Sequence, residues 1–118
     1  MIQVTPHMRI LVAKEPLDFR CGIDGTSAVC RRVLEQDPMS GALFIFRNRA
    51  CSMIRVLAYD GQGFWLATKR MSKGRFRHLD AFSKGSHVLS VDPHQLHMLL
   101  MGADWVRTQP VKYWRKIA

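Results

Sequence analysis

The residues with the clearest chemical potential are eight Lys and Arg side chains between positions 47 and 77, a span in which Asp60 is the only acid. They are Arg47, Arg49, Arg55, Lys69, Arg70, Lys73, Arg75 and Arg77. Cationic groups neutralise phosphates, and the counterions they release dominate affinity for nucleic acids. Ordinary surfaces intersperse both signs of charge. This excess therefore predicts a nucleic-acid-binding surface, while a merely solvated face is the competing interpretation.

The predicted strands and turns indicate which of these cations are the better candidates for phosphate contact. Arg55 falls in the middle of a predicted strand, where burial against an acid or a carbonyl is the alternative interpretation. The other seven fall in or beside turns and are favoured for phosphate contact. Tyr59, Phe64 and Phe76 are candidates for stacking on unpaired bases, although such aromatic side chains more often belong to a core.

Catalysis and metal binding find less support in the sequence. The candidate carboxylates for metal-dependent nuclease chemistry are Asp18, Asp24, Asp60 and Asp104. Each has a simpler role in a loop, cap or turn. His94 and His97 lie one helical turn apart with His87 nearby, but no fourth zinc ligand is evident. The sequence thus predicts no enzyme, no metal site and no cofactor.

Composition indicates a single globular domain. The chain has 118 residues, is 47% hydrophobic and has a pI near 10.2. It contains no run of about 18 apolar residues, and its first residues do not resemble a signal peptide. The three cysteines, Cys21, Cys30 and Cys51, lie far apart in the sequence. We expect them to be reduced thiols. We therefore expect a cytoplasmic protein that does not associate with membranes; self-association stays open.

Apolar patterning and turn residues outline the elements that position the cations. Strands are predicted over 9–13, 43–46, 53–59, 62–68 and 87–91. One helix is predicted to start between Asp24 and Ser27, with Ala28, Val29 and Val33 as its buried stripe. A second follows Asp92 as N-cap and Pro93 at its first position, and ends at Gly102.

The strongest local signal is Asp60-Gly61, which favours a two-residue hairpin turn. Such a turn would pair Tyr59 with Gln62 and Ile54 with Ala67. It would also separate an apolar face for the core (Ile54, Val56, Ala58, Gly63, Trp65 and Ala67) from a mixed face.

Together these signals predict an α+β fold: an antiparallel meander of about four or five strands with two helices packed on one face. Residues 1–106 are predicted to form the domain. Residues 107–118 are predicted to form a basic C-terminal tail.

Several blocks of sequence resemble a known family. They are residues 18–25 (DFRCGIDG), 37–49 (DPMSGALFIFRNR), 59–64 (YDGQGF), 69–76 (KRMSKGRF) and 99–105 (LLMGADW). In order and spacing these blocks resemble the TnpB accessory proteins of the insertion-sequence sixty-six class of bacterial transposable elements. The similarity covers roughly residues 9–106, and Cys21 stands where that family commonly has a lysine.

The resemblance implies a part in transposition beside a separate, larger transposase that carries the catalytic carboxylates. Charge and resemblance together predict a non-enzymatic accessory protein that binds DNA through its basic strands and loops. The alternative is an adaptor that docks on the transposase without touching DNA, with Tyr59, Phe64 and Trp114 as candidate anchors.

Overall fold

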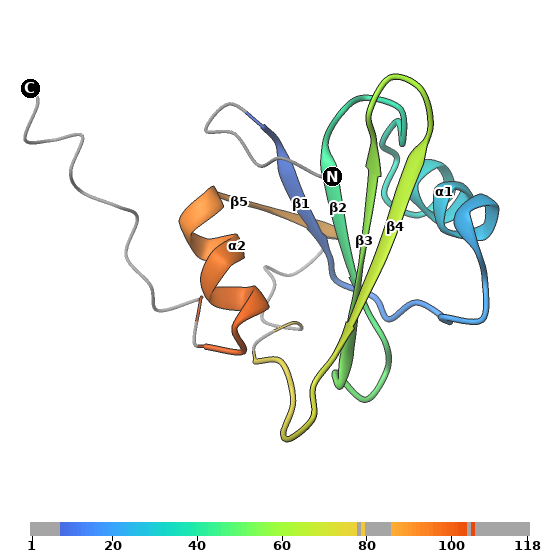
Figure 1. Ribbon diagram of the computed structural model, residues 1–118. Helices are drawn as coiled ribbons and strands as arrows, with labels where there is room; N and C mark the ends of the chain where they lie inside the picture. Colours follow the sequence, from blue (N-terminus) through green and yellow to red (C-terminus); the bar gives the residue numbers. More distant parts are fainter. Residues whose placement is uncertain (1–7, 78, 80–85, 104, 106–118) are drawn as a thin grey trace, which may run out of the picture.

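A twisted five-stranded sheet with one helix on each side organises the computed structural model (Figure 1), which describes residues 8–77, 79, 86–103 and 105. The elements in chain order are β1 (Ile10–Ala13), α1 (Ile23–Arg32), β2 (Leu43–Arg47), β3 (Met53–Tyr59), β4 (Phe64–Arg70), β5 (Val88–Val91) and α2 (Pro93–Leu100). The α+β class predicted from the sequence is confirmed.

The sheet is mixed, where an antiparallel meander was predicted. Its strand order is β4-β3-β2-β1-β5. β1 pairs in parallel with β2, and the other neighbours are antiparallel. A parallel pair needs a long crossover connection, and the segment containing α1 supplies it. β1 consequently lies inside the sheet, and β5 forms the edge opposite β4.

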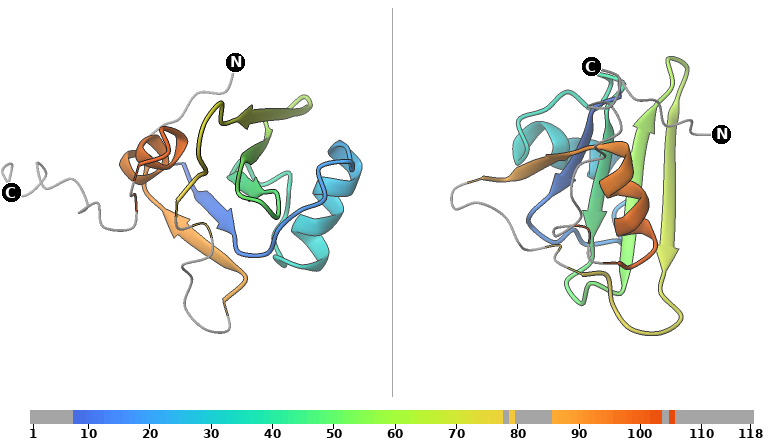
Figure 2. Two further views of the ribbon diagram at one scale, coloured as in Figure 1. Left: turned by 90° about the horizontal axis from the view of Figure 1, so that it is seen from below. Right: turned by 90° about the vertical axis from the view of Figure 1, so that its left-hand side faces the viewer.

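The prediction that both helices pack on one face is wrong: α1 and α2 cover opposite faces of the sheet (Figure 2). The physical reason lies in the central strands. All four residues of β1 are buried, and so are the first four of β2. Strands that are apolar at every position need cover on both faces, which two helices on one face do not provide.

On one face, α1 packs through a stripe that differs from the predicted one. The helix begins at Ile23 after Gly22, which provides no side-chain cap. Its buried residues are Thr26, Ser27 and Cys30, whereas Val33 is exposed. Burial raises the pKa of the Cys30 thiol to about 12, which keeps it protonated. Cys30 is thus a core residue.

On the other face, α2 forms as the sequence predicts. The Asp92 carboxylate accepts a hydrogen bond from Gln95 N at 2.7 Å, and Gln95 Oε1 accepts one from Asp92 N at 3.1 Å. This reciprocal capping box fixes the first turn. Leu96 and Leu99 are buried against the sheet. The helix thereby closes the second core.

The β3–β4 hairpin has a register two residues away from the predicted one. Tyr59 pairs with Phe64, and Ile54 pairs with Lys69. The Asp60 carboxylate accepts from Gly63 N at 3.0 Å while Asp60 N donates to Gly63 O at 3.1 Å. The paired strands end at Tyr59 and Phe64, and residues 60–63 form the loop that these hydrogen bonds close. A shift of two residues preserves the two predicted faces.

No helix among the described residues is long and apolar enough to cross a membrane. Residues 107–118, predicted as a basic tail, lie outside the described part of the chain, so the predicted boundary at 106 stays a prediction.

Candidate nucleic-acid interface

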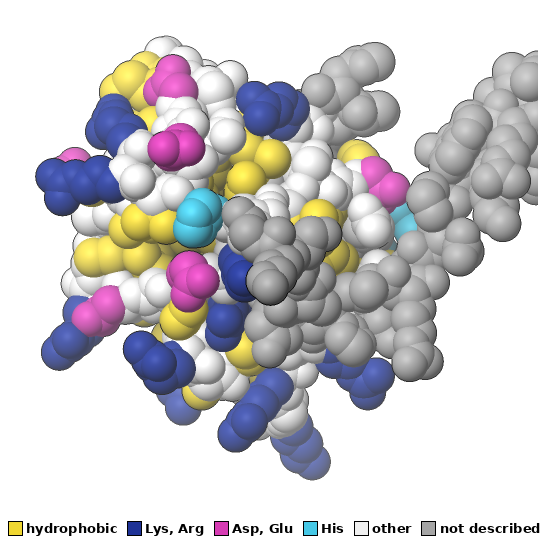
Figure 3. Space-filling model, turned by 180° about the vertical axis from the view of Figure 1, so that it is seen from behind, with side chains coloured by type: hydrophobic (Ala, Val, Ile, Leu, Met, Phe, Trp, Pro, Cys, Tyr) yellow, Lys and Arg dark blue, Asp and Glu magenta, His cyan; other side chains and the backbone are white. Residues whose placement is uncertain are grey.

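Most of the cations singled out in the sequence gather at one end of the sheet. The pairing of Met53 with Arg70 places the start of β3 beside the end of β4. The loop before β3 and the segment after β4 therefore emerge together, at the bottom of Figure 1. Seen from behind, Lys and Arg side chains line this end (Figure 3). We call it the basic end; its exposed cations are Arg49, Lys69, Arg70, Lys73, Arg75 and Arg77.

Two backbone hydrogen bonds tie the segments of the basic end to each other. Met71 N donates to Ser52 O at 2.9 Å, and Phe76 N donates to Cys51 O at 2.8 Å. Phe76 is 3% exposed and packs in the α2-side core. Arg75 and Arg77 therefore project into solvent on either side of an anchored residue. Their positions are set by packing, even though they lie in a loop.

The β2–β3 loop is fixed by the side chain of Asn48. Its Oδ1 accepts hydrogen bonds from Ser52 N at 3.0 Å and Met53 N at 3.1 Å. Its Nδ2 donates to Ser52 Oγ at 3.0 Å. An Asn side chain that satisfies nearby amides in this way stabilises a tight loop. The loop holds Arg49 at its exposed tip.

Two of the predicted contact residues have structural roles. Arg55 is 9% exposed and donates to Phe19 O at 2.8 Å and to Cys21 O at 2.6 Å. The half-buried Arg47 donates through Nε to Lys14 O at 3.1 Å. The carbonyl interpretation considered for Arg55 is the one that the structure supports. Its guanidinium holds the Phe19–Cys21 backbone against the sheet and is not presented to a partner.

Lys69 combines exposure with a contact to α2. Its Nζ donates to Leu100 O at 2.5 Å, at the carboxyl end of the helix. A cation at that end complements the free carbonyls and the helix dipole. Lys69 is therefore partly engaged within the fold.

Asp18, an acid that lies beside Arg49, is already paired. Asp18 lines a pocket with Arg49, and its carboxylate bonds Arg20 Nη2 at 2.7 Å. The side-chain hydrogen bond from Arg20 lowers the pKa of Asp18 to about 2, so the carboxylate stays ionised at neutral pH. The Arg20 charge offsets it. Asp60 lies at the opposite end of β3, in the hairpin loop.

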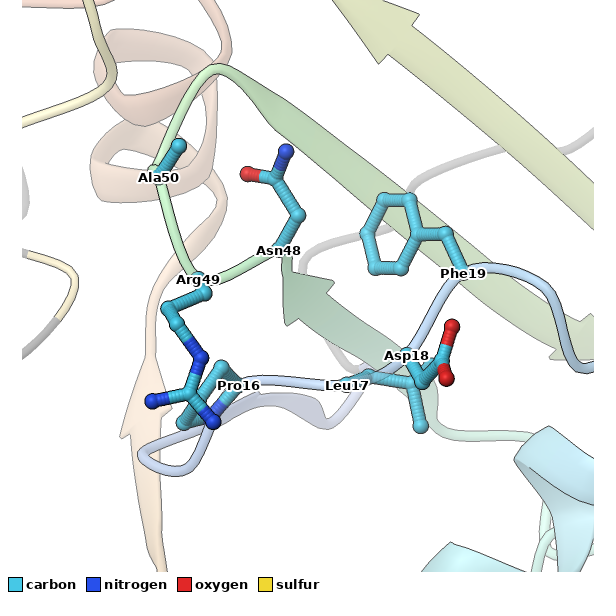
Figure 4. A pocket seen from close by; sticks show the side chains of 7 residues that line it. All are labelled: Pro16, Leu17, Asp18, Phe19, Asn48, Arg49 and Ala50. Carbon is cyan, nitrogen blue, oxygen red and sulfur yellow. The ribbon is translucent and has the colours of Figure 1, made fainter.

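That pocket lies between the segment after β1 and the β2–β3 loop (Figure 4). Its volume is about 430 Å³, and it is lined by Pro16, Leu17, Asp18, Phe19, Asn48, Arg49 and Ala50. β1 and β2 run parallel, so both segments leave the same edge of the sheet. Sequence reasoning singled out Arg49 and Asp18 separately but missed these residues as one site, since only the parallel pairing brings 16–19 beside 48–50.

The predicted aromatic candidates do not join the basic end. Tyr59 and Phe64 pack on each other at the hairpin end, with ring centroids 5.0 Å apart. Phe76 is buried in the core. Trp114 lies outside the described residues. Phe19 is instead the aromatic side chain that lines the pocket.

The candidate catalytic and metal-binding residues are dispersed in the described part of the chain. No group of three His, Cys, Asp or Glu side chains that could hold a metal occurs among these residues. Asp60 serves the hairpin, Asp18 pairs with Arg20, and Asp24 lies in the first turn of α1. Asp104 lies outside the described residues.

Comparisons with known proteins give a consistent picture. A family model described as "IS66 Orf2 like protein" matches residues 8–110. The chain is 35% identical over 120 residues to "Uncharacterized protein y4jC" of Sinorhizobium fredii (strain NBRC 101917 / NGR234), covering 100% of both chains. It is 36% identical over 115 residues to "Uncharacterized protein y4hO" of the same organism, covering 98% of this chain and 96% of the relative. No solved structure gives a significant match.

Proposed function

Because this chain belongs to the family of IS66 Orf2-like proteins, which implies an accessory role in transposition, we propose that it acts there by binding DNA through the basic end. The family is one of accessory proteins and is not known as an enzyme family. The role that we propose is therefore non-enzymatic, as the sequence predicts.

The observation that carries the proposal is the gathering of exposed cations on two loops held by hydrogen bonds. Arg49 comes from the β2–β3 loop, and Lys73, Arg75 and Arg77 come from the segment after β4. Cations that the fold already holds together lose little conformational freedom when they meet a row of phosphates. In the described part of the chain, loops and strand ends form the basic end, and no cationic recognition helix lies there. We therefore propose binding that is largely independent of sequence.

The test is DNA binding at a series of salt concentrations. Fluorescence anisotropy with a labelled duplex should give a logarithm of affinity that falls linearly with the logarithm of salt concentration. Six phosphate contacts give a slope of about −5 on duplex DNA. Affinity that does not change with salt would refute phosphate contact by the basic end.

A second candidate function is supported by a different feature, an apolar groove of about 290 Å³ between α2 and the β3–β4 strands. Ile54, Val56, Ala67, Leu96 and Leu100 contribute to its lining. β4 is an edge strand that α2 does not cover, and Trp65 on it is 44% exposed. Such a groove suits docking on the separate transposase, which is the adaptor alternative.

The two functions separate in one experiment. The transposase is captured on the protein from a mixture treated with nuclease. A complex that persists supports the adaptor, whereas a complex that disappears supports bridging by DNA. An Ala67→Glu substitution in the groove should abolish only the first kind of complex, because it places a charge on an apolar contact surface.

A further inference from the structure

We propose that the pocket between residues 16–19 and 48–50 receives an unpaired DNA base, with Arg49 bound to the phosphate of that nucleotide. The inference rests on the proposed DNA binding and deepens it: the basic end would contact the duplex, and the pocket would select DNA with an extrahelical nucleotide.

The apolar wall of the pocket is held rigidly before any ligand arrives. The Arg55 guanidinium lies over the Phe19 ring, 4.4 Å from the centroid, and also donates to Phe19 O at 2.8 Å. Leu17 N donates to Arg47 O at 2.8 Å, which fixes the same segment to the end of β2. Phe19 nevertheless stays half-buried, and its ring points into the space that faces Asn48 (Figure 4).

The opposite wall is equally fixed. The hydrogen bonds of Asn48 to Ser52 and Met53 hold the loop, and Cys51 adopts a φ of 58° to close it. A non-glycine residue in the left-handed region is uncommon and marks a loop held in one conformation by its surroundings. Preorganised walls reduce the conformational entropy lost on binding.

The polar groups of the pocket fit an anionic ligand with a flat apolar body. Asn48 uses its amide within the loop, and Asp18 is neutralised by Arg20. Among the described residues, the Arg49 guanidinium has no hydrogen-bond or ion-pair partner. It extends along Pro16 while the Asp18 carboxylate points away from it (Figure 4). One available guanidinium beside Pro16, Leu17 and Phe19 matches a phosphate joined to a base.

The position of the pocket connects it to the basic end. Arg49 belongs to both, since it lines the pocket and stands at the tip of the β2–β3 loop. The volume of about 430 Å³ is sufficient for one nucleotide. A duplex on the basic end presents its backbone, and only a nucleotide outside the stack reaches between the walls. Unpaired nucleotides make this displacement easiest, because they have no partner to lose.

The test compares three DNAs with the unmodified protein by fluorescence anisotropy. They are a perfect duplex, the same duplex with one unpaired adenine, and that duplex with an abasic site in place of the adenine. The duplex with the unpaired adenine should bind about tenfold more tightly than the duplex with the abasic site. This factor lies within the range of base–aromatic stacking. 2-Aminopurine at the unpaired position should change its fluorescence on binding.

Ala50→Trp provides the matching protein variant. It fills the pocket from an exposed loop position without removing a charge. The preference for the unpaired adenine should disappear while affinity for the perfect duplex is retained. Met39→Trp, which adds the same side chain at an exposed position before β2, should keep the preference.

The outcomes distinguish this inference from the proposed function. Salt-dependent binding that is equal for the adenine and abasic DNAs would overturn the pocket and leave DNA binding intact. The absence of salt-dependent binding to all three DNAs would overturn both. The comparison among DNAs uses the unmodified protein, so it remains decisive even where a variant does not fold.

Discussion

Arg55 and Phe19 form a single structural unit across 36 residues of chain, in which the guanidinium covers the ring at 4.4 Å and donates to the backbone carbonyl of the same residue at 2.8 Å. A cation that the sequence places among eight candidates for phosphate contact is thus used to hold a loop. The eight cations between positions 47 and 77 therefore fall into two groups: those that hold the fold together, and those that remain available to a partner.

Arg55→Met should destabilise the fold by about 3 kcal/mol, because it leaves the carbonyls of Phe19 and Cys21 without a donor in a largely buried site. Urea denaturation followed by circular dichroism measures the change. Arg75→Met, at an exposed position, should stay within about 0.5 kcal/mol of the unmodified protein. Equal stability of the two variants would contradict the structural role of Arg55.

Removal of two cations from the basic end should flatten the salt dependence of DNA binding. Lys73→Ala combined with Arg75→Ala should reduce the slope of log affinity against log salt by about 2, since each lost phosphate contact removes about 0.9. Arg31→Ala combined with Arg32→Ala, in the last turn of α1, removes the same charge elsewhere and should leave the slope nearly unchanged. Similar slopes for the two double variants would show that only net charge matters.

Asp60 should make the hairpin sensitive to acid. Hydrogen bonds from Gln62 N, Trp65 Nε1 and Gly63 N lower the pKa of its carboxyl below the ordinary value of 3.8. The folded state therefore holds the proton more weakly than the unfolded state. The stabilisation is present above pH 3.8 and is lost as the pH falls through the lowered pKa.

The measurement for Asp60 is Tm at neutral pH and in acid. The Tm of the unmodified protein should be higher at neutral pH than in acid. The difference in Tm between the unmodified protein and Asp60→Ala should be smaller in acid than at neutral pH. Asp60→Asn, which keeps an oxygen acceptor but does not titrate, should show a smaller loss of Tm on acidification than the unmodified protein. The Trp65 indole N–H resonance gives a local readout of the same bond, which is 2.8 Å long. An unchanged resonance in Asp60→Ala would contradict the hydrogen bond from Trp65 Nε1 to the Asp60 carboxylate.

Gly102→Ala should destabilise the protein by about 1–2 kcal/mol, because Gly102 has a φ of 77°, where a Cβ is strained. The added Cβ would also lie 2.7 Å from Met71 Cε. Thermal unfolding measures the loss. Gly63→Ala is the matched control, since its φ is not positive and a Cβ there meets nothing within 4 Å. A smaller loss for Gly102→Ala than for Gly63→Ala would contradict the assignment.

Local sequence signals determined much of this fold. The hairpin around Asp60, the capped start of α2 at Asp92 and the positive φ of Gly102 just beyond its end all depend on contacts within a few residues. Such contacts are encoded by residue type and spacing, so they can be read directly. The excess of positive charge after Arg47 is a property of composition and also needs no structure. The continuous apolar runs of β1 and β2 were a readable sign of two covered faces, and the prediction of both helices on one face missed it.

Tertiary structure alone decided which residues meet. The position of the hairpin was readable from Asp60-Gly61, but its register was not, since the Asp60 carboxylate accepts hydrogen bonds from Gln62 N and Gly63 N within a four-residue loop. The parallel pairing of β1 with β2 brings Phe19 beside Asn48, and the pairing of β3 with β4 brings the β2–β3 loop beside the segment after β4. Arg55 turned inward because two carbonyls from a distant loop were within its reach. These contacts join segments far apart in the chain, and only the folded sheet fixes the distance between them. The sequence by itself determined the charges and the elements. The packing of the sheet decided which charges were left for a partner.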